Sequence, residues 1–171
     1  SDGKVIAQNG AGRMNDERKA GLEAMYATYG NIEMDLQPQA QLAMPDNSVD
    51  AVFAFLIVHH WHFNEDQGEM TPSGSVDSYA NILRMLKPGG TFGIIEHLAP
   101  EGLSREASAA LHRAPAATIK SDLADAGFVL AAESDLLADH PEDDISAGWG
   151  DGATPRGQTQ RFVHLYRKPA N

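Results

Sequence analysis

Cysteine is absent from this chain of 171 residues, which excludes disulfide bonds, thiol nucleophiles and cysteine-based zinc sites and leaves the redox compartment open. Long hydrophobic runs are absent too: the longest, AVFAFLIV at residues 51–58, is far too short to cross a bilayer. No stretch resembles a signal peptide, but Ser1 is not a natural translation start. We therefore expect a cytoplasmic protein by default, and export to the periplasm stays open because the native N-terminus is not seen.

Basic residues are scarce as well. The chain has 13 Lys and Arg against 24 Asp and Glu, a formal net charge of -11, and the basic residues form no cluster. Nucleic-acid-binding proteins concentrate basic side chains on one face, and an anionic membrane surface would repel this chain. We therefore expect neither a nucleic acid nor a membrane as a partner. A hydrophobic content of 42% fits a single soluble domain over residues 1–171.

Apolar residues recur with strand and helix periods in alternation along the chain. The pattern predicts six strands, at residues 4–8, 31–36, 51–58, 91–96, 128–133 and 161–168, with helices before the second, fourth and fifth of them. Such alternation implies an α/β fold with a doubly wound, mostly parallel sheet and helices on both faces. No helix separates the last two strands, so we expect an antiparallel strand at the C-terminal edge of the sheet.

Local signals mark the ends of these elements. Asn15 can cap the first helix, and Gly30 suits its left-handed end. Pro88-Gly89-Gly90 is expected to end the helix before the fourth strand. The continuous apolar run at 51–58 is typical of a strand covered on both faces, with a buried helix segment as the alternative. Residues 135–160 show little periodicity, and a connection of that length is usually functional or mobile.

Three stretches together resemble the class I S-adenosylmethionine-dependent methyltransferases. They are LAMPDNSVDAVFAFLIVHHW at 42–61, ANILRMLKPGGTFGIIEH at 80–97 and LADAGFVLAAES at 123–134, in that family's order and spacing. The ending TQRFVHLYRKP looks like the family's final strand, and a bacterial group of predicted methyltransferases shares it together with His-His-Trp. The resemblance covers essentially the whole chain. It implies a Rossmann-like fold, S-adenosylmethionine as the cofactor and methyl transfer as the activity.

The stretch VIAQNGAG at 5–12 looks like the family's glycine-rich cofactor loop but stands in the wrong place. The family orders seven strands as 3-2-1-4-5-7-6 and places its loop after the first, where the cofactor approaches the backbone closely. Only one predicted strand lies between residues 4–8 and 51–58, so residues 4–8 match the second strand of the family. The first strand and its loop are then missing from this sequence: either they precede Ser1 in the natural gene product, which we expect, or this fold has lost them.

The resemblance assigns cofactor contacts to a few positions. Asn9 stands where the family usually has an acidic residue that accepts hydrogen bonds from the ribose hydroxyls. Gln39 and Ala40 stand near the expected adenine position, where backbone groups can make contact although the usual carboxylate is absent. His59, after the next strand, is a further expected cofactor contact. Asn9 and Gln39 are neutral where the family usually has acidic residues. We expect these two departures from the family pattern to affect the affinity for the cofactor.

The cluster HHWHFNED at 59–66 carries the most conspicuous chemistry. His59, His60 and His62 with Glu65 or Asp66 offer ligands for zinc or iron. Adjacent residues at the end of a strand point in opposite directions, and the spacing matches no known metal motif, so we expect no metal site. The other interpretations are a packed strand-end histidine and a base, His60, that acts on the acceptor.

Glu96 and His97 end the fourth strand and are expected to face the same crevice, with His97 as a general base oriented by Glu96. The alternative interpretation is that Glu96 and His97 only form a capped strand end, with the histidine exposed to solvent. His112 and Arg113, on an alanine-rich stretch, form a surface pair or reach an anionic group of a substrate. His140 and His164 are interpreted as loop and edge-strand residues.

The sequence thus predicts methyl transfer to a small-molecule acceptor, with His60 and His97 as the catalytic candidates. The acceptor itself cannot be read from the sequence. One alternative is a methyltransferase-like interaction module that has lost cofactor binding. A second is a histidine-metal hydrolase. The exposed last strand offers an edge for pairing in a homodimer.

Overall fold

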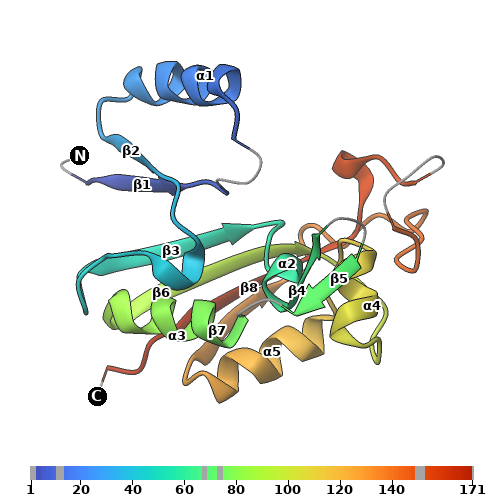
Figure 1. The fold of residues 1–171 in the computed structure, drawn as a ribbon. Coiled ribbons are helices and arrows are strands. Elements are labelled where there is room, and N and C mark those ends of the chain that lie inside the picture. Colours follow the sequence, from blue (N-terminus) through green and yellow to red (C-terminus); the bar gives the residue numbers. More distant parts are fainter. Residues whose placement is uncertain (1–2, 11–13, 67–68, 73–74, 149–152, 171) are drawn as a thin grey trace. The chain divides into compact units, whose positions relative to one another are not determined.

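The computed structural model describes residues 3–10, 14–66, 69–72, 75–148 and 153–170 of the chain. They form two compact units, Ser1–Ala43 and Met44–Asn171, called unit 1 and unit 2 below (Figure 1). Each unit is described by itself, and the prediction of a single domain over residues 1–171 stays a prediction. Among the described residues, no helix combines the length and the apolar character that a membrane span requires.

Unit 1 consists of a helix and a two-stranded parallel sheet. Strand β1 (Val5–Gln8) pairs with β2 (Ile32–Asp35), α1 (Asp16–Ala27) connects them, and the short 3-10 helix η2 (Gln39–Gln41) follows. The Asn15 side chain accepts a hydrogen bond from the Arg18 amide at 2.8 Å, and Gly30 has a φ of 72°, so both predicted helix signals are confirmed. No described residue of unit 1 is fully buried.

Unit 2 holds a four-stranded sheet in the order β3-β6-β8-β7. In chain order its elements are β3 (Val49–Phe55), α2 (His59–His62), β4 (Phe63–Asp66), β5 (Glu69–Pro72), α3 (Ser75–Met85), β6 (Leu86–His97), α4 (Arg105–Ala110), α5 (Ala116–Asp125), β7 (Val129–Ser134), the 3-10 helix η3 (Arg156–Gln158) and β8 (Arg161–Arg167). Strands β3 and β6 are parallel, whereas β8 runs antiparallel to both β6 and β7. The predicted α/β fold with an antiparallel strand at its C-terminus is confirmed.

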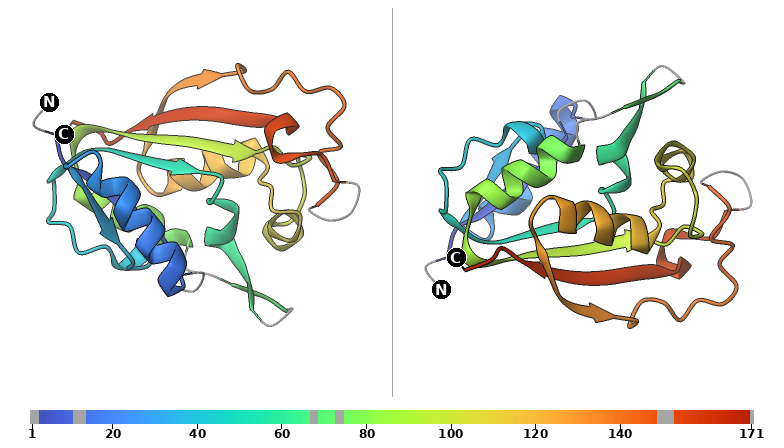
Figure 2. Two further views of the ribbon diagram at one scale, coloured as in Figure 1. Left: turned by 90° about the horizontal axis from the view of Figure 1, so that it is seen from above. Right: turned by 90° about the horizontal axis from the view of Figure 1, so that it is seen from below.

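Helices α3 and α5 of unit 2 lie on the same face of the sheet (Figure 2). Their apolar side chains and those of the strands form the core, which includes Tyr79, Ile82, Leu86, Phe92, Ile94, Ile119, Leu123 and Tyr166. Each large side chain removed from water contributes about 1.5–3 kcal/mol before the cost of conformational entropy. This core holds β3 and β6 in place, and the functional side chains follow the ends of these two strands.

The pairing of the strands within each unit agrees with the family order. In unit 2, β3, β6, β8 and β7 follow one another as family strands 4, 5, 7 and 6 do, and in unit 1 β1 pairs with β2 as family strands 2 and 3 do. The match of residues 4–8 to the second family strand stays a prediction. The last strand, β8, lies between β6 and β7 rather than at the edge. A homodimer cannot pair through β8, and the edge on that side of the sheet is β7.

The prediction that residues 51–58 form a strand buried on both faces is wrong in two respects. Strand β3 ends at Phe55, because Leu56 has a φ of 53° and turns the chain. Side chains alternate between the faces of a strand, so Ala54 is buried whereas Phe53 and Phe55 on the other face are 58% and 62% exposed. The Phe53 ring lies over Gly93 of β6, where a Cβ atom would come within 2.5 Å of it.

Two further boundaries differ from the sequence prediction. Strand β6 begins at Leu86, so Pro88-Gly89-Gly90 lie inside the strand, at a register shift opposite Val49 and Ala51. The hairpin of β4 and β5 was not predicted, because its pattern is short and polar. Of the predicted turn after β1, Ala11 and Gly12 lie outside the described residues.

Candidate active site

The histidines His59 and His60 lie at the carboxyl end of β3, on the single helical turn α2. The left-handed Leu56 ends the strand, and the amides of His60 and Trp61 then donate to the carbonyls of Ile57 and Val58, both at 3.0 Å. The turn is helical rather than extended, so successive side chains lie about 100° apart and not on opposite faces. The prediction that His59 and His60 point in opposite directions is therefore wrong: their ring centroids are 4.1 Å apart.

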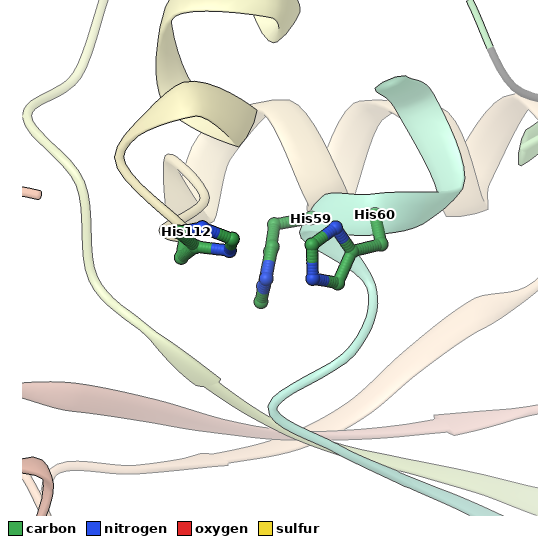
Figure 3. Close-up of side chains that lie close together, drawn as sticks. All are labelled: His59, His60 and His112. Carbon is green, nitrogen blue, oxygen red and sulfur yellow. The ribbon is translucent and has the colours of Figure 1, made fainter. Parts of the chain in front are cut away.

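His112 completes a cluster with these two residues. Its ring centroid lies 5.5 Å from that of His59 and 5.0 Å from that of His60 (Figure 3). One ring nitrogen of each histidine lies within 4.8 Å of the other two. His59 is buried, and His60 and His112 are half-buried. We call His59, His60 and His112 the histidine cluster.

The end of β6 holds His112 in this position. The Ala114 amide donates to the His97 carbonyl at 2.9 Å, and the Ala99 amide donates to the Ala114 carbonyl at 3.0 Å. His112 itself has a φ of 55°, a left-handed conformation that is uncommon for residues other than glycine. It directly follows the C-cap of α4, where this conformation is common, and the hydrogen bonds to the strand end fix it beside α2.

Glu96 lies beneath the cluster and is completely buried. Its Oε2 lies 3.0 Å from His59 Nδ1 and accepts a hydrogen bond from the His59 amide at 3.3 Å, and its Oε1 accepts one from the His97 amide at 2.8 Å. A buried carboxylate requires such partners. Glu96 therefore orients His59, not the His97 ring as the sequence predicts.

His97 points into the interior and is 2% exposed. Its Nδ1 lies 2.9 Å from the hydroxyl of the buried Thr159. Burial is the main reason why the pKa of His97 falls to about 4, which keeps the ring neutral near pH 7. His97 thus does not face an open crevice, and it joins the end of β6 to the segment before β8.

Arg113 is not a surface residue, contrary to one of the two interpretations of its sequence context. Its guanidinium pairs with both oxygens of Asp143, at 2.9 and 2.8 Å, and also donates to the carbonyls of Leu98 and Ala147. Burial alone would raise the pKa of Asp143, but the hydrogen bonds from Arg113 and from the Gln160 amide hold it below its usual range. Arg113 joins the long segment before β8 to the end of β6, and because it is only 3% exposed it does not reach a substrate anion.

His62 is separated from the histidine cluster. Its Nε2 lies 3.1 Å from Oδ2 of Asp122 on α5, which also pairs with Arg105. Together with the Tyr79 ring, whose centroid lies 6.2 Å away, this pair packs α2 against the helices. The side chains of Glu65 and Asp66, the other predicted metal ligands, lie outside the described residues.

Asn9, Gln39 and Ala40, the predicted cofactor contacts, belong to unit 1. Asn9 directly follows β1, and its Nδ2 donates to the Ala7 carbonyl at 3.0 Å and to the Tyr26 hydroxyl at 3.4 Å. Gln39 begins η2, but its side chain lies outside the described residues, and Ala40 is half-buried. These three residues stay predictions as cofactor ligands.

Two surface hollows lie away from the histidine cluster. One, of about 500 Å³, is lined by α1 and β2 of unit 1, and the other, of about 530 Å³, lies among β7, β8 and the ends of β6 and α5 in unit 2. Neither is lined by His59, His60 or His112. The chemistry of the cluster, rather than the size of a cavity, therefore identifies the candidate site.

Comparisons with known proteins agree with this geometry. The model of a methyltransferase domain family matches residues 14–94. No curated protein sequence matches the chain.

Solved structures share the fold at low sequence identity. The [4+2]-cyclase SpnF is 18% identical with a TM-score of 0.69, and the match covers 98% of this chain and 67% of that one. A SAM dependent methyltransferase from Aquifex aeolicus is 18% identical with a TM-score of 0.61, covering 96% and 69%. An S-adenosylmethionine dependent methyltransferase from Mesorhizobium loti is 14% identical with a TM-score of 0.59, covering 96% and 80%.

The chain thus shares the fold of the S-adenosylmethionine-dependent methyltransferases among these structures, as the resemblance predicts. The matched residues 14–94 make up slightly less than half of the chain. The identity of the acceptor is a separate question.

Two features of the site are absent from the sequence prediction. His112 follows His60 by more than fifty residues, and nothing in its alanine-rich context indicates a contact with α2. Glu96 stands beside His97, which suggests a local pair, but neighbouring side chains on a strand point to opposite faces. Only the pairing of β3 with β6 brings Glu96 to His59.

Proposed function

We propose that this protein transfers a methyl group from S-adenosylmethionine to a small-molecule acceptor bound beside the histidine cluster. The main observation is the position of His59, His60 and His112 at the carboxyl ends of β3 and β6. In open parallel sheets, ligands bind beyond these strand ends. The acidic composition of the chain agrees with a neutral or cationic acceptor.

The residues of unit 1 fit the cofactor's ribose and adenine groups. S-adenosylmethionine supplies the methyl group, which it carries on a sulfonium sulfur. In the part of the chain that the structure describes, no group donates to Oδ1 of Asn9, so this oxygen can accept a hydrogen bond from a ribose hydroxyl. Backbone groups of Gln39 and Ala40 meet the adenine edge. The side chain of His59 is only 4% exposed, so we assign it no direct contact with the cofactor.

His60 is the better placed of the two predicted bases. Its side chain is half-buried within the cluster, whereas His97 is enclosed and bound to Thr159. We assign to His60 the removal of the proton from an acceptor hydroxyl as the new bond to the methyl carbon forms. His97 is a positioning residue. Alignment of the two reactants supplies most of the rate enhancement in such a transfer.

Calorimetry with S-adenosylmethionine and S-adenosylhomocysteine, on the full-length gene product that carries this chain, tests the proposal. We expect both to bind, and Asn9→Leu to weaken binding about three- to tenfold, the value of one hydrogen bond. Asn31→Leu is the matched control, because Asn31 precedes β2 at the opposite end of the same two-stranded sheet. Absence of binding at millimolar concentrations of both compounds would contradict the proposal.

A second function, a methyltransferase-like module that binds partners without using the cofactor, is favoured by one observation. Neutral Asn9 and Gln39 stand at positions where the family usually has carboxylates. A fold can also carry another reaction, as the cyclase among the similar structures illustrates. The same calorimetry distinguishes the two, since a module of this kind would bind neither compound.

A further inference from the structure

We propose that His59, His60 and His112 bind a transition-metal ion, with Zn²⁺ as the expected occupant. This inference goes beyond the proposed function, and its test measures metal binding without methyl transfer. The two proposals can therefore fail independently of each other.

The first argument is the distance between the ring nitrogens. One nitrogen of each histidine lies within 4.8 Å of the other two. Zinc binds imidazole nitrogens at about 2.0–2.1 Å, so a tetrahedral ion holds them about 3.3 Å apart. Small rotations of the half-buried rings of His60 and His112 would bring the nitrogens this close to the buried ring of His59, the first residue of α2.

The second argument is the position of Glu96 behind His59. Its Oε2 lies 3.0 Å from His59 Nδ1, which favours the proton on that nitrogen and leaves the lone pair on Nε2. Metal-bound histidines nearly always have such a carboxylate or carbonyl behind them. Both ring nitrogens of His59 are buried and neither forms a hydrogen bond of regular geometry within the described part of the chain; Nδ1 has the Glu96 carboxylate 3.0 Å away. Buried polar atoms without partners are rare and require an explanation, and a metal ion provides one.

The backbone of His112 is held rigidly. This residue follows the C-cap of α4 in the left-handed conformation common at helix ends, since its amide donates to the Ala109 carbonyl at 2.8 Å and the Arg113 amide donates to the Ser108 carbonyl at 3.0 Å. The hydrogen bonds between Ala114 and the end of β6, together with the buried Arg113–Asp143 pair, fix the residues that follow. The His112 ring is thus held next to the rings of His59 and His60.

The number of ligands indicates the type of site. Within the described residues, the group that could hold an ion consists of three histidines, since His62 is paired with Asp122. Three protein ligands with a free fourth position are the arrangement of catalytic rather than structural zinc. A bound ion would take the lone pair of His60. It would then lower the pKa of an acceptor hydroxyl at the fourth position, a task otherwise assigned to His60 as a base.

The test is direct binding of Zn²⁺ and Co²⁺ to the untagged, chelator-treated protein, followed by calorimetry and by visible absorption of Co²⁺. We expect one ion per chain and the strong absorption of tetrahedral Co²⁺. His60→Asn and His112→Asn should each weaken binding at least tenfold, and asparagine tolerates the left-handed backbone at position 112. Glu96→Gln should weaken it ten- to hundredfold through the orientation of His59.

His140→Asn is the matched control, because His140 lies in the segment after β7 and outside the cluster. It should leave the affinity unchanged. A measurement on the unaltered protein avoids any folding defect: Zn²⁺ should shift the ring ¹⁵N resonances of His59, His60 and His112 but not that of His140. No stoichiometric binding, or binding that shifts other histidines and survives His112→Asn, would overturn the proposal.

Discussion

Unit 1 and unit 2 contain the same kinds of elements, parallel strands joined by an amphipathic helix, but only unit 2 has a core. In unit 2, Leu86, Ile119 and Leu123 are completely buried, whereas the large apolar residues of unit 1 include Val5, 48% exposed, and Tyr29, 67% exposed. Local sequence signals are equally clear in both units. Secondary structure therefore follows from local pattern, whereas burial depends on how many layers pack together.

The same comparison separates the roles of polar groups. The seven histidines and the buried ion pair all belong to unit 2. In unit 1 the polar contacts are exposed, as in the Lys4–Glu33 pair, or at most part-buried, as at Asn9. Removing one partner of a pair is therefore costly in unit 2 and cheap in unit 1.

Removal of the Asp143 carboxylate should have the largest effect. Asp143→Ala leaves the Arg113 guanidinium buried without its partner and should destabilise unit 2 by about 3–5 kcal/mol. Glu33→Ala, its counterpart in unit 1, should change stability by less than about 1 kcal/mol, because both charges are exposed. Urea unfolding of the two variants measures the difference. Similar losses would refute the contrast between the units.

Acidification should destabilise unit 2 through His164, which is buried beside Glu133 and Tyr166. Burial is the main cause of its low pKa, about 4. The charge of Lys120 lowers this pKa further, whereas the charge of Glu133 raises it. The unfolded chain binds the proton near pH 6.5, so the stabilisation is complete above that pH. It is lost as the pH falls towards 4, by up to about 1.4 kcal/mol per pH unit.

Equilibrium unfolding of the chain and of His164→Leu across this range measures the slope. The variant should show a shallower dependence between pH 6.5 and 4. Hydrogen exchange resolves the two units, and the protection of α1, in a unit without histidine, should not follow this slope. An unchanged slope in His164→Leu would contradict the assignment.

The smallest effects should come from alanine substitutions at two glycines, one in each unit, whose surroundings differ. At Gly90 of β6 an added Cβ would lie 2.7 Å from the Lys87 carbonyl oxygen, so Gly90→Ala should destabilise by about 1–3 kcal/mol. At Gly21 of α1 nothing lies within 4 Å, so Gly21→Ala should stabilise the helix by about 0.5–1 kcal/mol. Thermal unfolding of both variants should show shifts of opposite sign.

Much of the fold could be predicted from the sequence, because the six strands and three main helices follow from apolar periodicity and from caps such as Asn15. The order of strands was implied by the family resemblance, and the pairing within each unit agrees with it. The exposure of Phe53 and Phe55 could not be predicted, since a hydrophobic run indicates a strand without saying what covers its faces. The inclusion of Pro88-Gly89-Gly90 in β6 depends on pairing with β3, which local pattern does not contain.

The site was predicted less completely than the fold. His59 and His60 are conspicuous in the sequence, but the assumption of an extended strand end gave them divergent directions. The helical turn after Leu56 reverses that conclusion. The contacts of Glu96 with His59, and of His112 with both cluster histidines, join residues far apart in the chain. Such contacts arise only once β3 and β6 pair and Ala114 joins the end of β6.

The insertion of β8 between β6 and β7 has a consequence for synthesis of the chain. Strand β6 leaves the ribosome more than sixty residues before β8, and until β8 arrives its free edge has no neighbour on that side. Strand β7 is also unattached until then, since it pairs with β8 and not with β6. The four-stranded sheet therefore closes only when its final strand inserts, so slow, late closure of long loops governs its folding rate.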